Sequence, residues 1–148
     1  DHAGVERLID LAHIREGHAL ALFIGFAALI GGSVVADDDP IAAYKWEARP
    51  VIIFADSEKD PRFQRQVANL SSRSDDMTER GVVILMDTDP SAGSALRQMF
   101  RPRDFQIILI GKDGEIKLRR PHPITAEDLN RQIDRMPMRR REMNGGQS

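Results

Sequence analysis

Three carboxylate side chains lie close together in one short stretch of the sequence. Asp56, Glu58 and Asp60 alternate with other residues directly after an apolar run, and Arg62 follows them. Carboxylate oxygens bind divalent cations and can take up or release a proton. The stretch therefore indicates a small site for a cation or a polar ligand. The alternative interpretation is that these acids cap a helix, because negative charge near a helix N-terminus is favoured.

A second group of acids, Asp87-Thr88-Asp89, follows another apolar run. If the two apolar runs are parallel strands, their carboxyl ends lie at one edge of a sheet, where ligands tend to bind in α/β folds. We therefore expect residues 87–89 to project from the same edge as residues 56–60.

A run of basic residues, Arg139-Arg140-Arg141, lies near the C-terminus. Such a run could hold a phosphate group, an anionic lipid headgroup or an acidic partner, and we select Arg139 and Arg141 as binding candidates. The other interpretation is a solvated end of the chain, because Asn144-Gly145-Gly146 follows. We expect residues 139–148 to form a basic, flexible tail.

The composition excludes several classes of protein. The 148 residues include no cysteine, so they provide no thiolate nucleophile, disulfide or zinc–thiolate site. Thiol–disulfide exchange and thiol-peroxidase activity of this chain are excluded for the same reason. The formal net charge of −2 argues against a nucleic-acid partner. The sequence contains no Walker loop, dinucleotide-binding glycine turn or nucleophile elbow, so we expect no cofactor, no metal and no catalytic residue.

Four segments have the composition of β-strands. Residues 51–55, 82–86 and 107–110 are continuous apolar runs, which are typical of strands buried on both faces. Residues 115–119 instead alternate between apolar and charged side chains, which is typical of an edge strand. The Asp-Gly pair in segment 111–114 predicts a tight antiparallel hairpin between the last two strands.

Helices are predicted in the intervals between these strands. Asp60 is a suitable N-cap for the first helix and Pro61 a suitable first residue. A second helix is expected over residues 89–100, and Thr125 caps a third that ends before Pro137. The apolar residues expected on their inner faces are Phe63, Val67 and Leu70 in the first, Ala92, Ala95, Leu96 and Met99 in the second, and Leu129, Ile133 and Met136 in the third.

Together these elements predict an α/β fold with a four-stranded mixed sheet (order 2-1-3-4) and helices on both faces. The first two strands are expected to be parallel, with a right-handed crossover between them, and the third to be antiparallel to the first. We take this as the minimal thioredoxin-like arrangement. Tyr44 and Trp46, the single Tyr and Trp of the chain, are expected to pack over the sheet.

Residues 13–36 have the pattern of an export signal, or of an N-terminal hydrophobic helix that precedes the domain. A charged start precedes an apolar run from Ala19 to Ile30, and small residues lead to Ala36, after which we expect cleavage. Two alternatives remain open: an uncleaved membrane anchor, because residues 19–36 approach the length of a transmembrane helix, and a buried helix. We therefore expect a periplasmic or secreted protein. If the segment is retained, we expect an inner-membrane anchored protein, and only then a membrane partner.

The sequence divides into five parts. The chain begins with Asp1 and its first methionine is Met77, so we expect an upstream extension before the export segment. The expected parts are an upstream extension at 1–12, a signal peptide or membrane anchor at 13–36, a linker and domain entry at 37–48, the thioredoxin-like domain at 49–138 and the basic tail at 139–148.

Six short segments between residues 44 and 143 occur in a recognisable order. They are Tyr44-Lys45-Trp46, Arg49-Pro50, Asp60-Pro61-Arg62, residues 109–114, residues 136–139 and residues 141–143. In this order they resemble a thioredoxin-like domain family of unknown function, which occurs in small exported bacterial proteins and in vertebrate matrix proteins with sushi repeats. The family has no established reaction, so the resemblance implies the fold and export rather than an activity.

The resemblance also locates the position at which a redox thioredoxin does its chemistry. Such a protein carries Cys-x-x-Cys at the start of the first helix and a cis-proline before the third strand. Residues 58–61 and 104–106 occupy these positions here, which makes Phe105 a further binding candidate. We expect a redox-inactive, exported module that binds an unidentified protein or envelope component. The alternative is an enzyme or metal-binding protein that uses the acidic loop of Asp56, Glu58 and Asp60.

Overall fold

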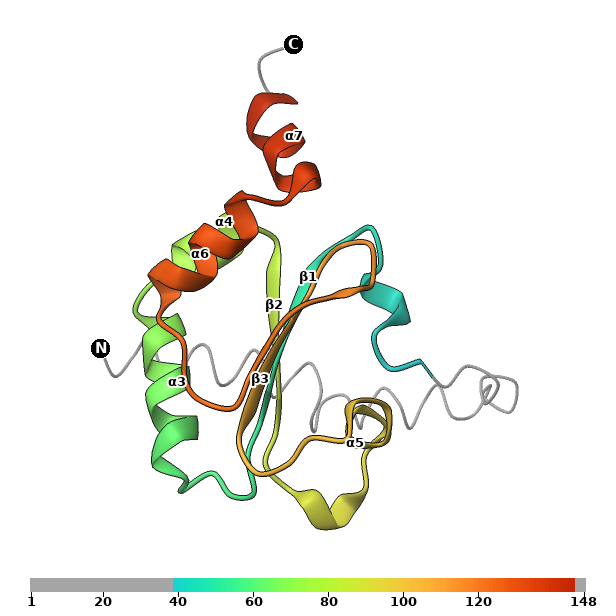
Figure 1. Cartoon of the computed structure of the whole chain (residues 1–148), viewed down its shortest axis with the longest axis vertical. Coiled ribbons are helices and arrows are strands. Elements are labelled where there is room, and N and C mark those ends of the chain that lie inside the picture. The colour runs from blue at the N-terminus through green and yellow to red at the C-terminus, as the bar shows by residue number, and fades with distance from the viewer. Residues whose placement is uncertain (1–38, 146–148) are drawn as a thin grey trace.

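A four-stranded sheet forms the centre of the computed structural model, which describes residues 39–145 (Figure 1). Its strands are β1 (Arg49–Phe54), β2 (Val82–Asp87), β3 (Gln106–Ile110) and β4 (Ile116–Arg120). Their order across the sheet is β2-β1-β3-β4. β1 is parallel to β2, and β3 is antiparallel to both β1 and β4. The predicted order and directions of the strands are therefore confirmed.

Helices cover both faces of the sheet (Figure 1). In chain order they are η2 (Ala42–Tyr44), α3 (Pro61–Ser71), α4 (Ser74–Glu79), η3 (Pro90–Ala92), α5 (Ala95–Phe100), α6 (Ala126–Asp134) and α7 (Pro137–Gly145). Side chains of α3, α4 and α6 pack on one face, and side chains of α5 pack on the other. This is the predicted α/β, thioredoxin-like arrangement.

Alternation along β1 divides the hydrophobic core into two halves. Val51 and Ile53 point to the face covered by α3, α4 and α6, whereas Ile52 and Phe54 point to the face covered by α5. All four residues are completely buried. A strand with both faces covered must be apolar at every position, which is why this part of the sequence is a continuous apolar run.

Helix α3 begins where the sequence predicts. The carboxylate of Asp60 accepts a hydrogen bond from the backbone N–H of Arg62 at 2.8 Å, and Pro61 is the first helical residue. This bond satisfies one of the amide groups that a helix leaves unpaired at its N-terminus. The predicted inner residues, Phe63, Val67 and Leu70, are all buried.

The connection between β2 and β3 differs from the single helix predicted over residues 89–100. It contains the short η3 and then α5, and between them Gly93 adopts a φ of +53° in the left-handed region. A residue in that conformation interrupts a right-handed helix. Of the residues predicted for the inner face, Leu96 is buried, whereas Ala92, Ala95 and Met99 are exposed.

Helix α4 and the position of Trp46 differ from what the sequence predicts. Helix α4 is not predicted, and its Met77 is buried in the core. Trp46 is 59% exposed instead of packing over the sheet. Trp46 has a φ of +70°, and its backbone N–H donates to the carbonyl of Lys112, so the backbone is tied to the β3–β4 hairpin and the ring lies outside the core. Tyr44 does pack against the core on the α5 side.

The predicted upstream extension and export segment lie outside the described residues, as does the end of the chain after residue 145. The predicted N-terminal hydrophobic helix lies outside them for the same reason. Within residues 39–145, none of the helices combines the length and the apolar character needed to cross a bilayer.

The prediction of a flexible tail is wrong for residues 139–145, because they belong to α7. Arg139 is 4% exposed, and its guanidinium lies 2.8 Å from Glu79 and 3.1 Å from Asp134. Arg139 is also the buried residue of α7. Ion pairs, more than apolar packing, therefore hold this helix to the domain.

These ion pairs extend to the start of β1. The guanidinium of the buried Arg49 donates two hydrogen bonds to Glu142 of α7, at 3.2 and 3.1 Å. Lys112 of the β3–β4 hairpin donates a further bond to Glu142 at 2.7 Å. Arg80 donates two bonds to Asp134, at 3.0 and 2.9 Å. We name this set the α7 network, and it comprises Arg49, Glu79, Arg80, Lys112, Asp134, Arg139 and Glu142.

The two best-connected carboxylates of the α7 network have lowered pKa values. Burial acts to raise the pKa of Glu142, but hydrogen bonds from Arg49 and Lys112 outweigh it and lower that pKa below 4.5. Burial likewise acts to raise the pKa of Asp134, and bonds from Arg80 and Arg139 lower it below 3.8. A carboxylate whose pKa is lower in the folded state stabilises the fold at neutral pH, and this contribution is lost as the pH falls through the folded-state pKa.

Replacing Leu109 by alanine should destabilise the domain by about 2–5 kcal/mol, because the completely buried side chain would leave a cavity in the central sheet. Replacing Ile116 by alanine should cost less than about 1 kcal/mol, because this residue of the edge strand is 48% exposed. Denaturant unfolding followed by circular dichroism measures both effects. An equal loss in the two variants would contradict the assigned burial.

Replacing Glu142 by glutamine should lower the free energy of unfolding by about 1–3 kcal/mol at pH 7, because the buried Arg49 loses its carboxylate partner. The wild-type chain should lose stability as the pH falls through the lowered pKa of Glu142, and the variant should lose less. Glu47→Gln, at an exposed position, is the control with the same change in charge. Thermal unfolding at several pH values provides the measurement, and parallel pH profiles for wild type and E142Q would contradict this contribution.

Candidate functional site

A cluster of charged side chains lies where the loop after β1 meets the loop before β3. The antiparallel register of β1 and β3 places these two loops side by side. Arg62, in the first turn of α3, connects them, because its guanidinium lies 2.7 Å from Asp60 and 2.7 Å from Asp104. The centre of this guanidinium lies 5.6 Å from the centre of the Phe105 ring. We name Asp60, Arg62, Asp104 and Phe105 the Arg62 cluster.

The structure brings together three of the residues selected from the sequence, Asp60, Arg62 and Phe105. Asp104 is the member of the Arg62 cluster that sequence reasoning missed, because its partner Arg62 is 42 positions away and no local pattern marks such a contact. Asp104 also has a φ of +57°, in the left-handed region that Asp adopts more readily than most residues. Within residues 39–145 every peptide bond is trans, so no cis-proline precedes β3.

The three carboxylates of the acidic loop do not form a metal site. Asp56 and Glu58 are exposed, whereas the carboxylate of Asp60 binds the side chain and the backbone N–H of Arg62. Among residues 39–145, no group of three Asp, Glu or His side chains is arranged to hold a metal ion. For Asp60 the helix-capping interpretation is therefore the one that the contacts support.

Asp60 and Arg62 of the cluster stay charged at neutral pH. The hydrogen bond from the Arg62 side chain lowers the pKa of Asp60, and this effect exceeds the opposite effect of burial. The carboxylates of Asp60 and Asp104 in turn raise the pKa of Arg62 above its ordinary value. A general acid or base needs a pKa near the working pH. The geometry is therefore better suited to a fixed ionic contact than to proton transfer.

A second ionic contact lies at the same edge of the sheet, at the end of β2. The guanidinium of Arg97 lies 2.9 Å from Asp87, donates to the carbonyl of Ala55 at 2.7 Å and lies over the ring of Phe54. The backbone N–H of Ala55 also donates to the carbonyl of Asp87 at 3.1 Å, so the two parallel strands end together as predicted. Asp87 is therefore engaged in holding α5 on the sheet.

The remaining predicted candidates lie at the other end of β1. Arg139 is buried in the α7 network, which includes Arg49 at the first position of β1, whereas Arg141 is exposed on α7. The residues selected from the sequence thus divide between the two ends of the sheet. Arg139 is engaged with Glu79 and Asp134, so it is a structural residue and not a free binding group.

The segments that carry the family resemblance converge in the α7 network. Four of the six segments contribute Arg49, Lys112, Arg139 and Glu142, and the first three of these residues all form ion pairs with Glu142. Their shared contact explains why residues so far apart in the sequence belong to one pattern. These residues support the fold rather than a reaction.

The chain is similar to a solved structure and to a family model. A crystal structure of StoA from Bacillus subtilis is 13% identical in sequence with a TM-score of 0.38, and the match covers 57% of this chain and 81% of the StoA chain. A family model described as a domain of unknown function (DUF4174) matches residues 40–142. This range includes every described helix and strand from η2 to α6. The chain therefore belongs to the DUF4174 family.

Proposed function

We propose that this DUF4174 domain is an exported, redox-inactive module that binds another protein or an envelope component. The Arg62 cluster is the observation that carries the proposal. It lies after β1, at the position where a redox thioredoxin holds its thiols, and its charged side chains are held by one another. With no cysteine in the chain and a stably ionised Asp60, this position favours recognition over reaction.

The Arg62 cluster offers a fixed charged surface to a partner. Arg62 is 39% exposed and Asp104 is 59% exposed, so a partner can reach both side chains. Their mutual contact and the buried ring of Phe105 hold the guanidinium in one orientation. A side chain that is already ordered loses less conformational entropy on binding.

One nitrogen of the Arg62 guanidinium remains available for such a partner. Nε and Nη2 donate to Asp60 and Asp104, whereas Nη1 makes no hydrogen bond within residues 39–145. A guanidinium nitrogen can only donate hydrogen bonds. The chemistry therefore favours a partner group with an acceptor oxygen, such as a backbone carbonyl or a carboxylate.

The export part of the proposal is supported by the sequence. A charged start, an apolar run and a small-residue end over residues 13–36 are typical of a signal peptide.

Titration with calcium, magnesium and manganese should give no heat of binding and no change in melting temperature. The reason is that Asp56 and Glu58 are exposed while Asp60 is engaged with Arg62. Isothermal calorimetry and thermal unfolding provide the measurements. Saturable heat that disappears in Asp60→Asn would instead favour an enzyme or metal-binding protein that uses the acidic loop.

Arg62→Gln should reduce the capture of a partner from an envelope fraction by about fivefold or more, because it removes the charged group of the cluster. The domain should stay folded, since Asp60 still caps α3 through a backbone N–H. Arg65→Gln is the matched control, because it removes the same charge from an exposed position of α3.

Affinity capture on the immobilised full chain, quantified by mass spectrometry, measures both variants. If the wild-type chain captures no protein or envelope component under several ionic conditions, the binding function is wrong. If R62Q captures as much as R65Q, the Arg62 cluster is not the binding surface.

A further inference from the structure

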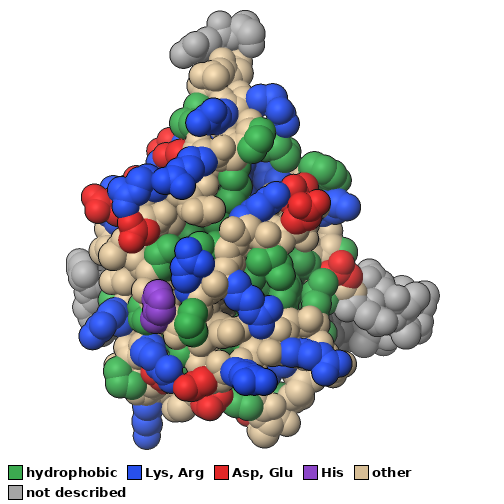
Figure 2. All heavy atoms as spheres, in the orientation of Figure 1, with side chains coloured by type: hydrophobic (Ala, Val, Ile, Leu, Met, Phe, Trp, Pro, Cys, Tyr) green, Lys and Arg blue, Asp and Glu red, His purple; other side chains and the backbone are tan. Residues whose placement is uncertain are grey.

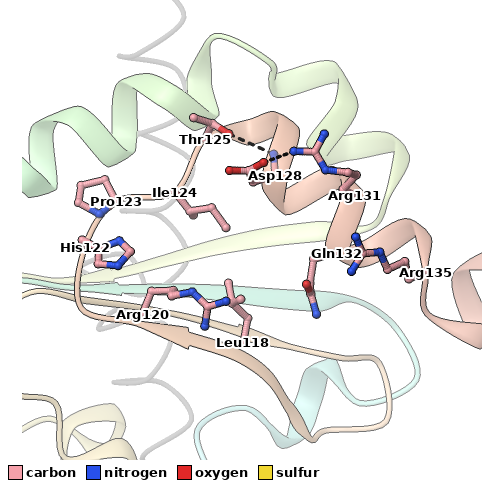
Figure 3. Close-up of a pocket in the computed structure, with 10 residues that line it drawn as sticks. All are labelled: Leu118, Arg120, His122, Pro123, Ile124, Thr125, Asp128, Arg131, Gln132 and Arg135. Atoms are coloured by element: carbon pink, nitrogen blue, oxygen red, sulfur yellow. Dashed lines mark hydrogen bonds and ion pairs between the residues drawn. The ribbon is translucent and has the colours of Figure 1, made fainter.

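A cavity of about 310 Å³ lies between the edge strand β4 and helix α6 (Figure 3). Leu118 and Arg120 of β4 line it on one side. Arg131 of α6 lines it on the other side, together with Arg135, the residue that caps the C-terminus of α6. The loop that joins β4 to α6 borders the cavity at one side (Figure 3). Its volume is at the lower end of the range for sites that hold small molecules.

The wall of the cavity carries an excess of positive charge. Arg120, Arg131 and Arg135 contribute guanidinium groups, and Asp128 contributes a single carboxylate. Figure 3 shows this carboxylate turned toward Arg131, with which it forms an ion pair. Arg120 and Arg135 are therefore not neutralised by it. Figure 2 shows a similar excess of Lys and Arg over Asp and Glu on one face of the molecule.

The side chains of Arg120 and Arg135 are not used to hold the fold together. Within residues 39–145, the Arg135 side chain has no hydrogen bond or ion pair. The guanidinium of Arg120 contacts the backbone carbonyl of its neighbour Arg119 at 3.3 Å. In contrast, Arg119 donates to Gln106 at 2.7 Å and to the carbonyl of Phe100 at 2.6 Å, which ties β4 to β3 and α5.

The rest of the wall supplies apolar and amide surface. Leu118 and Ile124 offer apolar contacts, and Gln132, which extends from α6 toward β4 in Figure 3, offers both a donor and an acceptor. A guanidinium binds the oxygens of a carboxylate or a phosphate through paired hydrogen bonds. The cavity therefore combines guanidinium groups, which bind an anionic oxygen group, with apolar and amide side chains, which contact the rest of a short organic molecule.

We propose that the cavity between β4 and α6 binds a small organic molecule with an anionic oxygen group, and that Arg120 and Arg135 hold this group. A carboxylate and a phosphate ester share the chemistry that the guanidinium groups recognise. The cavity shares no lining residue with the Arg62 cluster. This site goes beyond the proposed function, and its failure would leave the Arg62 surface unaffected.

The test is an NMR titration of the full chain with succinate, inorganic phosphate and glycerol 3-phosphate, each compared with sodium chloride at the same ionic strength. At least one probe should saturate, and the shifts should concentrate in residues 118–135. Saturation by succinate assigns a carboxylate ligand, and saturation by either phosphate probe assigns a phosphate ligand. Shifts that stay linear with all three probes, or that saturate elsewhere in the chain, would overturn the proposal.

Variants locate the binding groups. Arg120→Gln and Arg135→Gln should each weaken binding by about fivefold to tenfold, because each removes a charge-assisted hydrogen bond. Arg103→Gln removes the same charge from an exposed position outside the cavity, and it should change binding by less than about twofold. Unchanged melting temperatures would verify that the variants are folded. Equal weakening in all three would assign the effect to overall charge and overturn the proposal.

Discussion

The burial of β1 on both faces is the constraint on which the rest of the structure depends. Residues 51–54 are completely buried, so the middle of the strand has no room for a charged side chain. Charged groups that contact β1 must therefore lie at its two ends. Arg49 joins the α7 network at one end, and Arg62 and Arg97 hold loops and α5 at the other. The polar interactions of the domain are thereby divided between the two ends of the sheet.

The two ends differ in how accessible their charges are. Arg49 and Arg139 are buried, and their carboxylate partners join α7 to β1, α4 and α6. A buried charge is costly unless its partners are well placed, so these contacts leave little freedom for a ligand. Arg62 and Asp104 are partly exposed and pair at the surface. Within one fold, the α7 network thus stabilises the domain, while the Arg62 cluster presents a charged surface that a partner can reach.

Sequence patterns predict the features that depend on neighbouring residues. The apolar runs of the strands, the Asp60 cap of α3 and the hairpin at residues 111–114 are all short-range, and the structure confirms them. Helix α7 is different, because a run of arginines has the composition of a solvated tail. The burial of Arg139 depends on Glu79, which is 60 positions away. The contact between Arg62 and Asp104 is missed for the same reason.

The arginines of the domain fall into two classes, according to whether they bind a carboxylate of another helix or strand. Those that do are required by the fold. Arg49, Arg80 and Arg97 each bind a carboxylate of another element, so their positions follow from the architecture. Among residues 39–145, Arg120 and Arg135 have no such partner, and in this they match exposed arginines elsewhere on the surface. What sets them apart is that both line one cavity, whose wall also includes the apolar Leu118 and Ile124. An anion bound there gains a charge-assisted hydrogen bond from a guanidinium that the fold does not use, so the cavity has a physical reason to bind one that does not depend on how the domain is stabilised.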